Sequence, residues 1–229
     1  MAQVPIARTV VDSVTYARAV IRAWRALYTS PPTQAQVGVL YAQWMVETSG
    51  KACWCWNIGN VKASASQVAA GVPWFDLPGT WEIINGKRVV LAEGDPGRRF
   101  RAFASLDEAM REHLAFLRGK RYAPSWPHVE AGNPDGFARA LKAQGYYTAS
   151  ADDYARIMVA AHKQWMRSDA YDRAMAEIVA ASEAETQPDI GAYRAEEPAR
   201  PVYAMPPTEP ICEHCHYPFR ACACEPDAA

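Results

Sequence analysis

Between residues 37 and 45, apolar side chains recur every three or four residues, which is the spacing of one face of an α-helix. The run Pro31-Pro-Thr33 just before this segment provides a helix start. Glu47 belongs to the same face, because it follows Leu40 by seven residues and Trp44 by three, and about 100° per residue puts it within roughly 60° of both. The pattern predicts a helix that ends with a carboxylate on its apolar side.

Glu47 in that position has the properties of a general acid. Removing a carboxyl group from water raises its pKa, and a raised pKa keeps the group protonated near neutral pH, where it can donate a proton. The alternative is a helix-ending Glu that simply faces solvent, because glutamate occurs in last turns without any catalytic role. The helix pattern alone leaves both interpretations open.

A β-hairpin is predicted downstream of this helix. Trp81-Glu-Ile-Ile84 and Lys87-Arg-Val-Val-Leu91 flank the dipeptide Asn85-Gly86, and Asn-Gly between β-rich runs is a strong signal for a two-residue turn. Such a turn places Glu82 opposite Val89, so the hairpin supplies a second carboxylate on a separate lobe. The same segment contains three rival carboxylates, Asp76, Glu93 and Asp95.

Further helices are predicted from apolar spacing and capping signals. The first covers about residues 9–29, with Val10 near its start and Leu27 near its end on the apolar face. Ser105-Leu-Asp-Glu108 has the spacing of a capping box, which begins a helix running to about Leu117. The remaining helices are expected over 134–143 and over 150–180.

Composition and charge divide the chain into a body and a tail. It has 229 residues, half of them hydrophobic, which is enough for one core of ordinary domain size. Residues 1–180 carry 21 Lys and Arg against 16 Asp and Glu, a net charge of +5, whereas residues 181–229 carry 3 against 9, a net charge of −6. We therefore expect a folded domain over 1–180, a Pro-rich flexible linker over 181–210 and a Cys-rich tail over 211–229.

The mildly basic body suits contact with an anionic polymer such as a bacterial cell wall, and ordinary surface variation explains the same excess of charge. No recognition motif accompanies the scattered basic residues, which argues against nucleic-acid binding. The start of the chain lacks a basic stretch followed by an apolar core, and no segment approaches about 20 apolar residues. We expect a protein made in the cytoplasm without a signal peptide and without a membrane span.

Six cysteines form two groups. Cys53 and Cys55 are too close in sequence for an easy mutual disulfide, and their Trp neighbours indicate buried thiols. In the tail, four thiols at Cys212, Cys215, Cys222 and Cys224 are enough for a tetrahedral zinc site. Disulfides or a simple reduced tail are the alternatives. A structural zinc knuckle at the end of a linker would serve as a docking module for a protein partner.

Aromatic residues also fall into two groups. Trp24, Trp44 and Trp165 lie on apolar helix faces, which predicts packing in the core. Others lie in expected loops or strand edges, where flat rings can stack on sugar faces. This second group contains Trp54, Trp56, Trp74, Trp81, Tyr146 and Tyr147.

Several short motifs occur in an order that resembles glycoside hydrolase family 73, the bacterial and phage β-N-acetylglucosaminidases of the lysozyme-like superfamily. The resemblance covers about residues 10–166. Its motifs are Glu47-Thr-Ser-Gly50, Asn57-Ile-Gly-Asn-Val-Lys62, Thr80-Trp-Glu82 with the Asn-Gly turn, Phe100-Arg-Ala-Phe-Ala-Ser105, Gly145-Tyr-Tyr-Thr148 and Asp153-Tyr-Ala155.

The resemblance implies a mainly α (α+β) fold, a lysozyme-like helical domain with a small β-hairpin lobe. It implies that Glu47 is the catalytic acid, that Glu82 is a second catalytic carboxylate and that Tyr146 lines the site. It further implies that Asn57 begins the loop that closes below the acid. Tyr147 stands where the family usually has Ala, and the loop before Asn57 is unusually rich in Cys and Trp.

The expected function is hydrolysis of a β-1,4 glycosidic bond of bacterial peptidoglycan. One protonated carboxyl donates to the leaving oxygen, and a second group activates water or stabilises the oxocarbenium-like transition state. No cofactor is needed for this chemistry. Substrate-assisted catalysis by an N-acetyl group would need no second carboxylate, and glucosaminidase and muramidase linkages suit the same acid. Such a protein would reach the wall by lysis, in a phage virion or through an injection machine. The alternative function is a non-catalytic, lysozyme-like structural or wall-binding component of a phage tail.

Overall fold

The computed structural model describes residues 3–48, 52–84 and 87–186. Packing divides the chain into one compact unit, Met1–Glu183, and a second unit, Ala184–Ala229. Residues 181–186 of the predicted linker are helical, so that the last helix ends six residues later than predicted. The rest of the linker and the tail cysteines lie outside the described residues and remain predictions.

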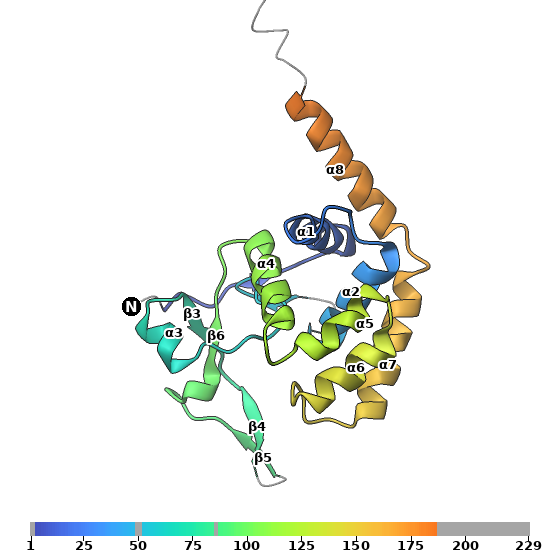
Figure 1. The fold of residues 1–229 in the computed structure, drawn as a ribbon. Helices are drawn as coiled ribbons and strands as arrows, with labels where there is room; N and C mark the ends of the chain where they lie inside the picture. The colour runs from blue at the N-terminus through green and yellow to red at the C-terminus, as the bar shows by residue number, and fades with distance from the viewer. Residues whose placement is uncertain (1–2, 49–51, 85–86, 187–229) are drawn as a thin grey trace, which may run out of the picture. The chain divides into compact units, whose positions relative to one another are not determined.

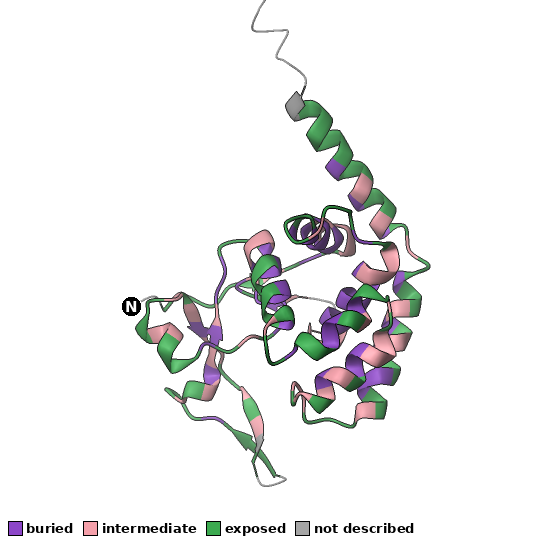
Figure 2. Ribbon diagram, viewed as in Figure 1, coloured by how far each residue is buried: buried purple, intermediate pink, exposed green. Residues whose placement is uncertain are grey.

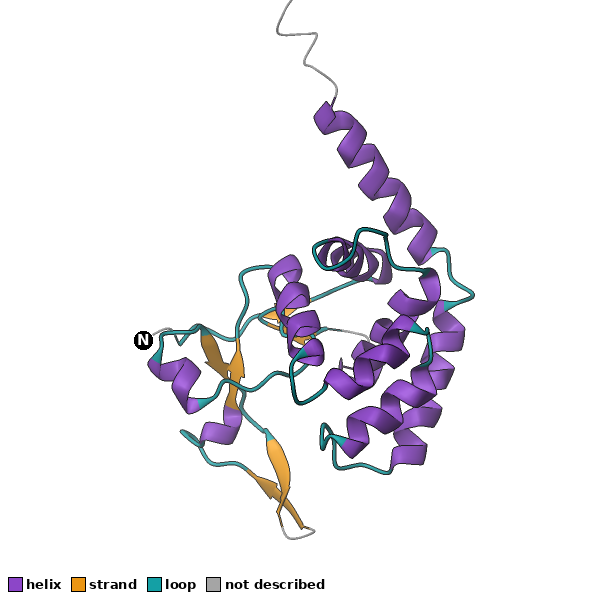
Figure 3. Ribbon diagram, viewed as in Figure 1, coloured by secondary structure: helices purple, strands orange, loops and turns teal. Residues whose placement is uncertain are grey.

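The described part is mainly helical, with short antiparallel strand pairs (Figures 1 and 3). The α-helices are α1 Ser13–Arg25, α2 Gln34–Thr48, α3 Ala65–Ala69, α4 Leu106–Arg118, α5 Trp126–Glu130, α6 Pro134–Ala143, α7 Ala151–Trp165 and α8 Ala170–Thr186, and two 3₁₀ turns cover Pro96–Arg98 and Ala123–Ser125. The strands are β1 Arg8–Thr9, β2 Cys53–Trp54, β3 Trp74–Asp76, β4 Trp81–Ile84, β5 Lys87–Val90 and β6 Arg99–Arg101. They pair as β1–β2, β3–β6 and β4–β5. The predicted fold class, mainly α with a small β part, is confirmed.

Helix α2 lies in the core. Every residue from Val37 to Trp44 is buried, because α1 packs on one side of the helix and α7 on another (Figure 2). The packing role predicted for Trp24, Trp44 and Trp165 is confirmed, since all three are buried. A burial this complete fixes the helix axis, and with it the position of the residues in its last turn.

The first helix is shorter than predicted at both ends. Asp12 caps it, because its Oδ1 accepts hydrogen bonds of 2.9 Å from the backbone N–H groups of Val14 and Thr15. Val10 therefore lies outside the helix and is 71% exposed. Leu27 lies beyond the end of the helix at Arg25 and is also exposed. Local capping chemistry overrides the apolar spacing here.

The last predicted helix, 150–180, is two helices. Helix α7 ends at Trp165 and α8 begins at Ala170. Between them, the Ser168 hydroxyl donates to the Trp165 backbone carbonyl at 2.8 Å and satisfies a carbonyl that the helix leaves free. Within the described residues, none of these helices is both long and apolar enough to cross a membrane.

Capping at Ser105 places α4 as predicted, with one difference. The Ser105 Oγ accepts from the Glu108 backbone N–H at 3.1 Å, which is the first half of a capping box. The Glu108 carboxylate returns to the N–H of Ala104, at 2.7 Å, one residue earlier than the motif requires. Helix α6 occupies Pro134–Ala143 as predicted.

The hairpin has the predicted register. β4 pairs with β5 so that Glu82 lies opposite Val89 and Trp81 opposite Val90. The turn dipeptide itself lies outside the described residues. Glu82 therefore projects from the face of the hairpin that the Asn-Gly spacing indicated.

A buried histidine joins α4 to α2 beneath the loop that follows Glu47. His113 Nε2 lies 3.2 Å from Gln43 Oε1, and both side chains are buried. Gly59 packs so closely on the imidazole that a Cβ there would lie 2.5 Å from His113 Nδ1. Burial lowers the pKa of His113 to about 4. The imidazole is therefore neutral in the folded protein under ordinary conditions.

This burial predicts an acid-sensitive stability. The His113 pKa is about 4 in the folded state and about 6.5 when unfolded, so between these values the unfolded chain binds more protons. The free energy of unfolding should fall by about 3 kcal/mol as pH falls from 7 to 4 on account of this group alone. Urea unfolding of wild type and His113→Gln at both pH values measures it. The variant should lose about 3 kcal/mol less than wild type, and equal losses would contradict the prediction.

Candidate active site

Glu47 lies in the last turn of α2 and is held from two directions. Its Oε1 accepts a hydrogen bond of 2.9 Å from the hydroxyl of Tyr154, on α7. Its backbone carbonyl accepts one of 2.9 Å from the Nδ2 of Asn60, in the loop after β2. The carboxyl is thus positioned by residues far apart in the sequence.

Burial raises the pKa of Glu47, which is the direction predicted from its place on the apolar face. The hydrogen bond from Tyr154 lowers the pKa and opposes this effect, but desolvation is the larger cause. A carboxyl with a raised pKa retains its proton closer to neutral pH, as a general acid requires.

Tyr147 stacks on Tyr154, the residue that contacts Glu47, and holds its ring in place. The rings of Tyr147 and Tyr154 stack with centroids 3.8 Å apart and planes at 9°. The Tyr147 hydroxyl donates to the Ala138 backbone carbonyl at 3.0 Å, which anchors the stack to α6. Burial and the neighbouring Glu47 raise the pKa of Tyr154 far above its usual value, so its hydroxyl stays a donor. Because Tyr154 donates to Oε1, Oε2 is the oxygen on which a protonated Glu47 would carry its proton.

Removing this hydrogen bond should shift the pH dependence of activity. In Tyr154→Phe the ring stack is retained while Glu47 loses a bond that lowers its pKa. We expect the alkaline limb of the kcat profile to move to higher pH, with kcat about tenfold lower. Tyr171→Phe is the matched control, because its hydroxyl makes one hydrogen bond of 2.6 Å to Pro32, outside the cleft. An unmoved alkaline limb in Tyr154→Phe would show that this tyrosine does not tune the acid.

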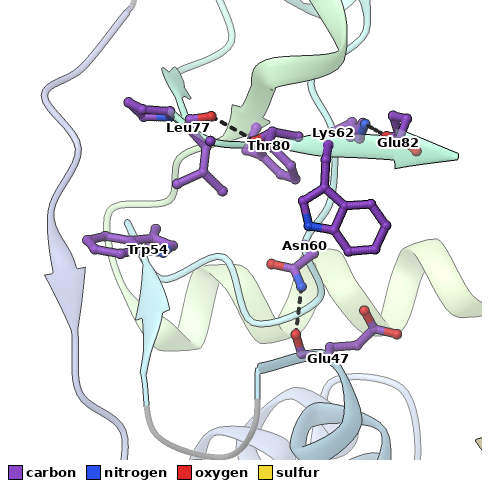
Figure 4. Close-up of a pocket in the computed structure, with 11 residues that line it drawn as sticks. Glu47, Trp54, Asn60, Lys62, Leu77, Thr80 and Glu82 are labelled. Carbon is purple, nitrogen blue, oxygen red and sulfur yellow. Dashed lines mark hydrogen bonds and ion pairs between the residues drawn. The ribbon is translucent and has the colours of Figure 1, made fainter. Parts of the chain in front are cut away.

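Glu47 lines a cleft of about 610 Å³ between the helical part and the hairpin (Figure 4). Four of the predicted site residues meet there, namely Glu47, Trp54, Trp81 and Glu82. The other lining residues are Asn60, Lys62, Leu77, Pro78, Gly79, Thr80 and Phe100. Trp54 is 37% exposed and Trp81 45% exposed, and the Arg88 guanidinium lies over one face of the Trp81 ring, 4.5 Å from its centroid.

Glu82 stands across the cleft from Glu47 and forms an ion pair with Lys62 (Figure 4). Two contacts with Phe100, on β6, hold Lys62 in place. The backbones of the two residues form a β-bridge, and the Lys62 ammonium lies 5.6 Å from the Phe100 ring centroid. Glu82 is about half exposed, which keeps its carboxylate solvated. The hairpin carboxylate is therefore tied to a cation on the body of the domain.

The rival carboxylates do not line the cleft. Asp76 forms an ion pair with the buried Arg98 and joins β3 to the turn before β6. Asp95 caps that turn, since its Oδ1 accepts from the Gly97 backbone N–H at 2.7 Å. Glu93 is exposed. Among the carboxylates weighed from the sequence as a second catalytic group, Glu82 is the one that faces the site.

The side-chain amide of Asn57 is used in hydrogen bonds to the backbone. Its Nδ2 donates to the carbonyls of Val61 and Arg101, at 2.8 and 2.9 Å, and its Oδ1 accepts from the Val61 N–H at 2.8 Å. These bonds occupy the buried amide and hold the loop against β6. Trp56 is half-buried, packs against the core and does not line the cleft.

Tyr146 lies on the other side of Glu47, in a second hollow of about 410 Å³. Its hydroxyl donates to the Gly59 carbonyl at 3.5 Å. Burial, and then the nearby Glu47, raise the pKa of Tyr146 well above its ordinary value, so it remains protonated. Sequence motifs placed Tyr146 near the acid, but they did not indicate that Tyr154 is the residue that contacts the carboxyl. The only signal was the short motif Asp153-Tyr-Ala155.

The thiols of the body are buried and free, as predicted. Thr9 Oγ1 lies 2.9 Å from Cys53 Sγ, and Cys55 Sγ donates to the Pro5 carbonyl at 3.6 Å. Burial raises the pKa of Cys53, which disfavours a reactive thiolate. Over residues 3–48, 52–84 and 87–186, no group of three metal-ligating side chains occurs. The four tail cysteines predicted to bind zinc lie outside these ranges.

No protein-family model matches the chain, and no curated protein matches its sequence significantly. Two solved structures are similar to it. One is a C-terminally truncated glycoside hydrolase domain of Salmonella typhimurium FlgJ, which is 25% identical and gives a TM-score of 0.43 over 69% of this chain and 99% of that chain. The other is the glycoside hydrolase domain of the same protein, 23% identical, with a TM-score of 0.41 over 76% of this chain and 97% of that chain. At these TM-scores the likeness is distant.

Proposed function

We propose that this protein is a peptidoglycan hydrolase that cleaves a β-1,4 glycosidic bond with Glu47 as general acid. The observation that supports this most is the environment of Glu47. Desolvation raises its pKa, Tyr154 occupies one carboxyl oxygen, and the carboxyl lines an open cleft. A surface glutamate of no catalytic importance needs none of these features.

In this mechanism the Glu47 proton moves from Oε2 to the glycosidic oxygen as the bond to the anomeric carbon breaks. Glu82, paired with Lys62 across the cleft, activates the incoming water or stabilises the positive charge that develops on the sugar. The Lys62 ammonium and the carboxylate form a pair in which the cation keeps Glu82 directed at the cleft.

The cleft suits a polymer of sugars. Trp54 and the open face of Trp81 offer rings on which sugar faces can stack, and Asn60, Thr80 and Lys62 supply polar groups to the same cleft that can bind hydroxyls. The open form of the cleft lets a chain pass through it. The finer parts of the function, namely virion association, the bond cleaved and a zinc-binding tail that docks a partner, rest on the sequence alone.

Zymography on bacterial cell walls tests the proposal. Wild type should clear the wall and Glu47→Gln should not. Equal clearing by both would remove Glu47 from the mechanism, and no clearing by either would favour the non-catalytic wall-binding alternative. Mass spectrometry of the released fragments identifies the reducing-end sugar and therefore the bond.

A further inference from the structure

The second hollow lies beside the cleft and shares part of its lining. It is lined by Glu47, Gly59, Asn60, Val61, Lys62, Phe116, Arg121, Tyr122 and Tyr146. Three of these residues, Glu47, Asn60 and Lys62, also line the cleft. Glu47 therefore borders both spaces, and a chain that extended from the cleft past Glu47 would enter the hollow.

The positions of the carboxyl groups assign a role to each space. A second carboxylate acts at the anomeric carbon, so the sugar that carries this carbon belongs on the Glu82 side, in the cleft. The acid protonates the oxygen that links this sugar to the next. The next sugar, which leaves, then lies past Glu47 in the hollow that contains Tyr146.

Arg121 gives this hollow a fixed positive charge. Its Nε donates to the Gln144 carbonyl at 3.1 Å and its Nη2 to the Gly145 carbonyl at 3.3 Å, while the guanidinium lies 5.2 Å from the Tyr122 ring centroid. Gly145 allows this approach, since its φ is +70° and a Cβ there would lie 3.1 Å from Arg121 Nη2. Carbonyls orient the guanidinium without neutralising it, and no ion pair joins it to another described residue.

The other charges in the hollow cancel. Lys62 is paired with Glu82, and Glu47 is uncharged when it carries the proton that catalysis needs. When Glu47 is protonated, Arg121 is therefore the one described residue lining the hollow whose charge is not neutralised by an ion pair. Beside it, Phe116 is 37% exposed and can pack against the apolar face of a sugar.

We propose that Arg121 binds a carboxylate carried by the leaving sugar, so that the hollow selects a sugar with an acidic substituent. This inference rests on the proposed function. A guanidinium presents paired donors that match a carboxylate, and one that is already oriented loses little entropy on binding. In a bacterial wall glycan such a carboxylate belongs to the lactyl ether of the acidic sugar or to the peptide attached to it.

Binding to two oligosaccharides of equal length tests the proposal. One is a peptide-free wall glycan, in which alternate sugars carry a lactyl carboxylate, and the other is a neutral chito-oligosaccharide. Calorimetry uses Glu47→Gln as the parent, so that neither ligand is cleaved. Adding Arg121→Gln should raise Kd for the acidic glycan roughly tenfold. It should change Kd for the neutral glycan by no more than about twofold. Arg121→Lys should restore part of the loss, and Arg111→Gln, exposed on α4, should change neither.

Salt dependence gives a second readout that needs no change at Arg121. Raising the salt concentration should weaken binding of the acidic glycan to the parent much more than binding of the neutral one. Equal salt dependence, or an equal effect of Arg121→Gln on both ligands, would overturn the proposal. Turnover of wall glycan by wild type tests the hydrolase function separately, so a selective Arg121 effect without turnover would reject the enzyme and retain the anion site.

Discussion

Glu47→Gln is expected to lower kcat on wall glycan by roughly 10³-fold, because a positioned general acid contributes about 10²- to 10⁴-fold and an amide cannot donate in its place. Gln has nearly the same shape and can still accept the hydrogen bond of Tyr154, so the fold and substrate affinity should persist. Initial rates on soluble glycan and Kd for the same ligand separate the chemical step from binding.

The matched control is Glu93→Gln, which removes an exposed carboxylate that does not line the cleft. Its kcat should equal that of wild type. In wild type, activity should also fall as pH rises through the pKa of Glu47, because the protonated form is the reactive one and burial raises that pKa. Activity that rises with pH over this range would contradict the assignment of Glu47 as the acid.

Glu82→Gln is expected to lower kcat about 10²-fold, because the developing positive charge on the sugar loses the carboxylate that faces it. Lys62→Met should have a smaller effect, since it removes the partner that directs Glu82 but leaves the carboxylate in place. Lys62→Arg keeps the ion pair and should recover most of the activity. Steady-state rates of the three variants on one soluble glycan give the comparison.

The opposite outcome for Glu82 has a defined meaning. If Glu82→Gln keeps wild-type kcat while Glu47→Gln does not, the N-acetyl group of the substrate supplies the second function and Glu82 binds rather than reacts. A glycan whose reacting sugar lacks the N-acetyl group separates the two mechanisms. It should remain a substrate if Glu82 acts and should not be cleaved if the acetamide acts.

Two glycines lie where the hairpin joins the rest of the domain. The hairpin joins the domain through segments that contain Gly79 and Gly94, both with positive φ and with open space around a Cβ. Glycine adopts this conformation at no steric cost, so both connections turn without strain. The Lys62–Glu82 pair then ties the hairpin to the body across the cleft.

Local sequence signals determined the elements that carry the two carboxyl groups. Apolar spacing placed α2 and put Glu47 on its buried side, and the Asn-Gly dipeptide fixed the register that pairs Glu82 with Val89. Both signals act within a few residues, because helix period and turn geometry are properties of short segments. The same locality explains why the Asp12 cap, and the bond from the Ser168 hydroxyl to the last residue of α7, accompany helix ends that apolar spacing alone did not predict.

Tertiary structure decided what surrounds those groups. Tyr154 reaches Glu47 across 107 residues of sequence, and Arg121 reaches the backbone at Gly145 across 24. No periodicity encodes such contacts, since they depend on how α2, α6 and α7 pack together. The sequence therefore singled out Glu47 and Glu82 as candidate catalytic residues. The packed fold determined that Tyr154 contacts the Glu47 carboxyl, that Glu82 lies across the cleft from it and that Arg121 lines the hollow on its other side.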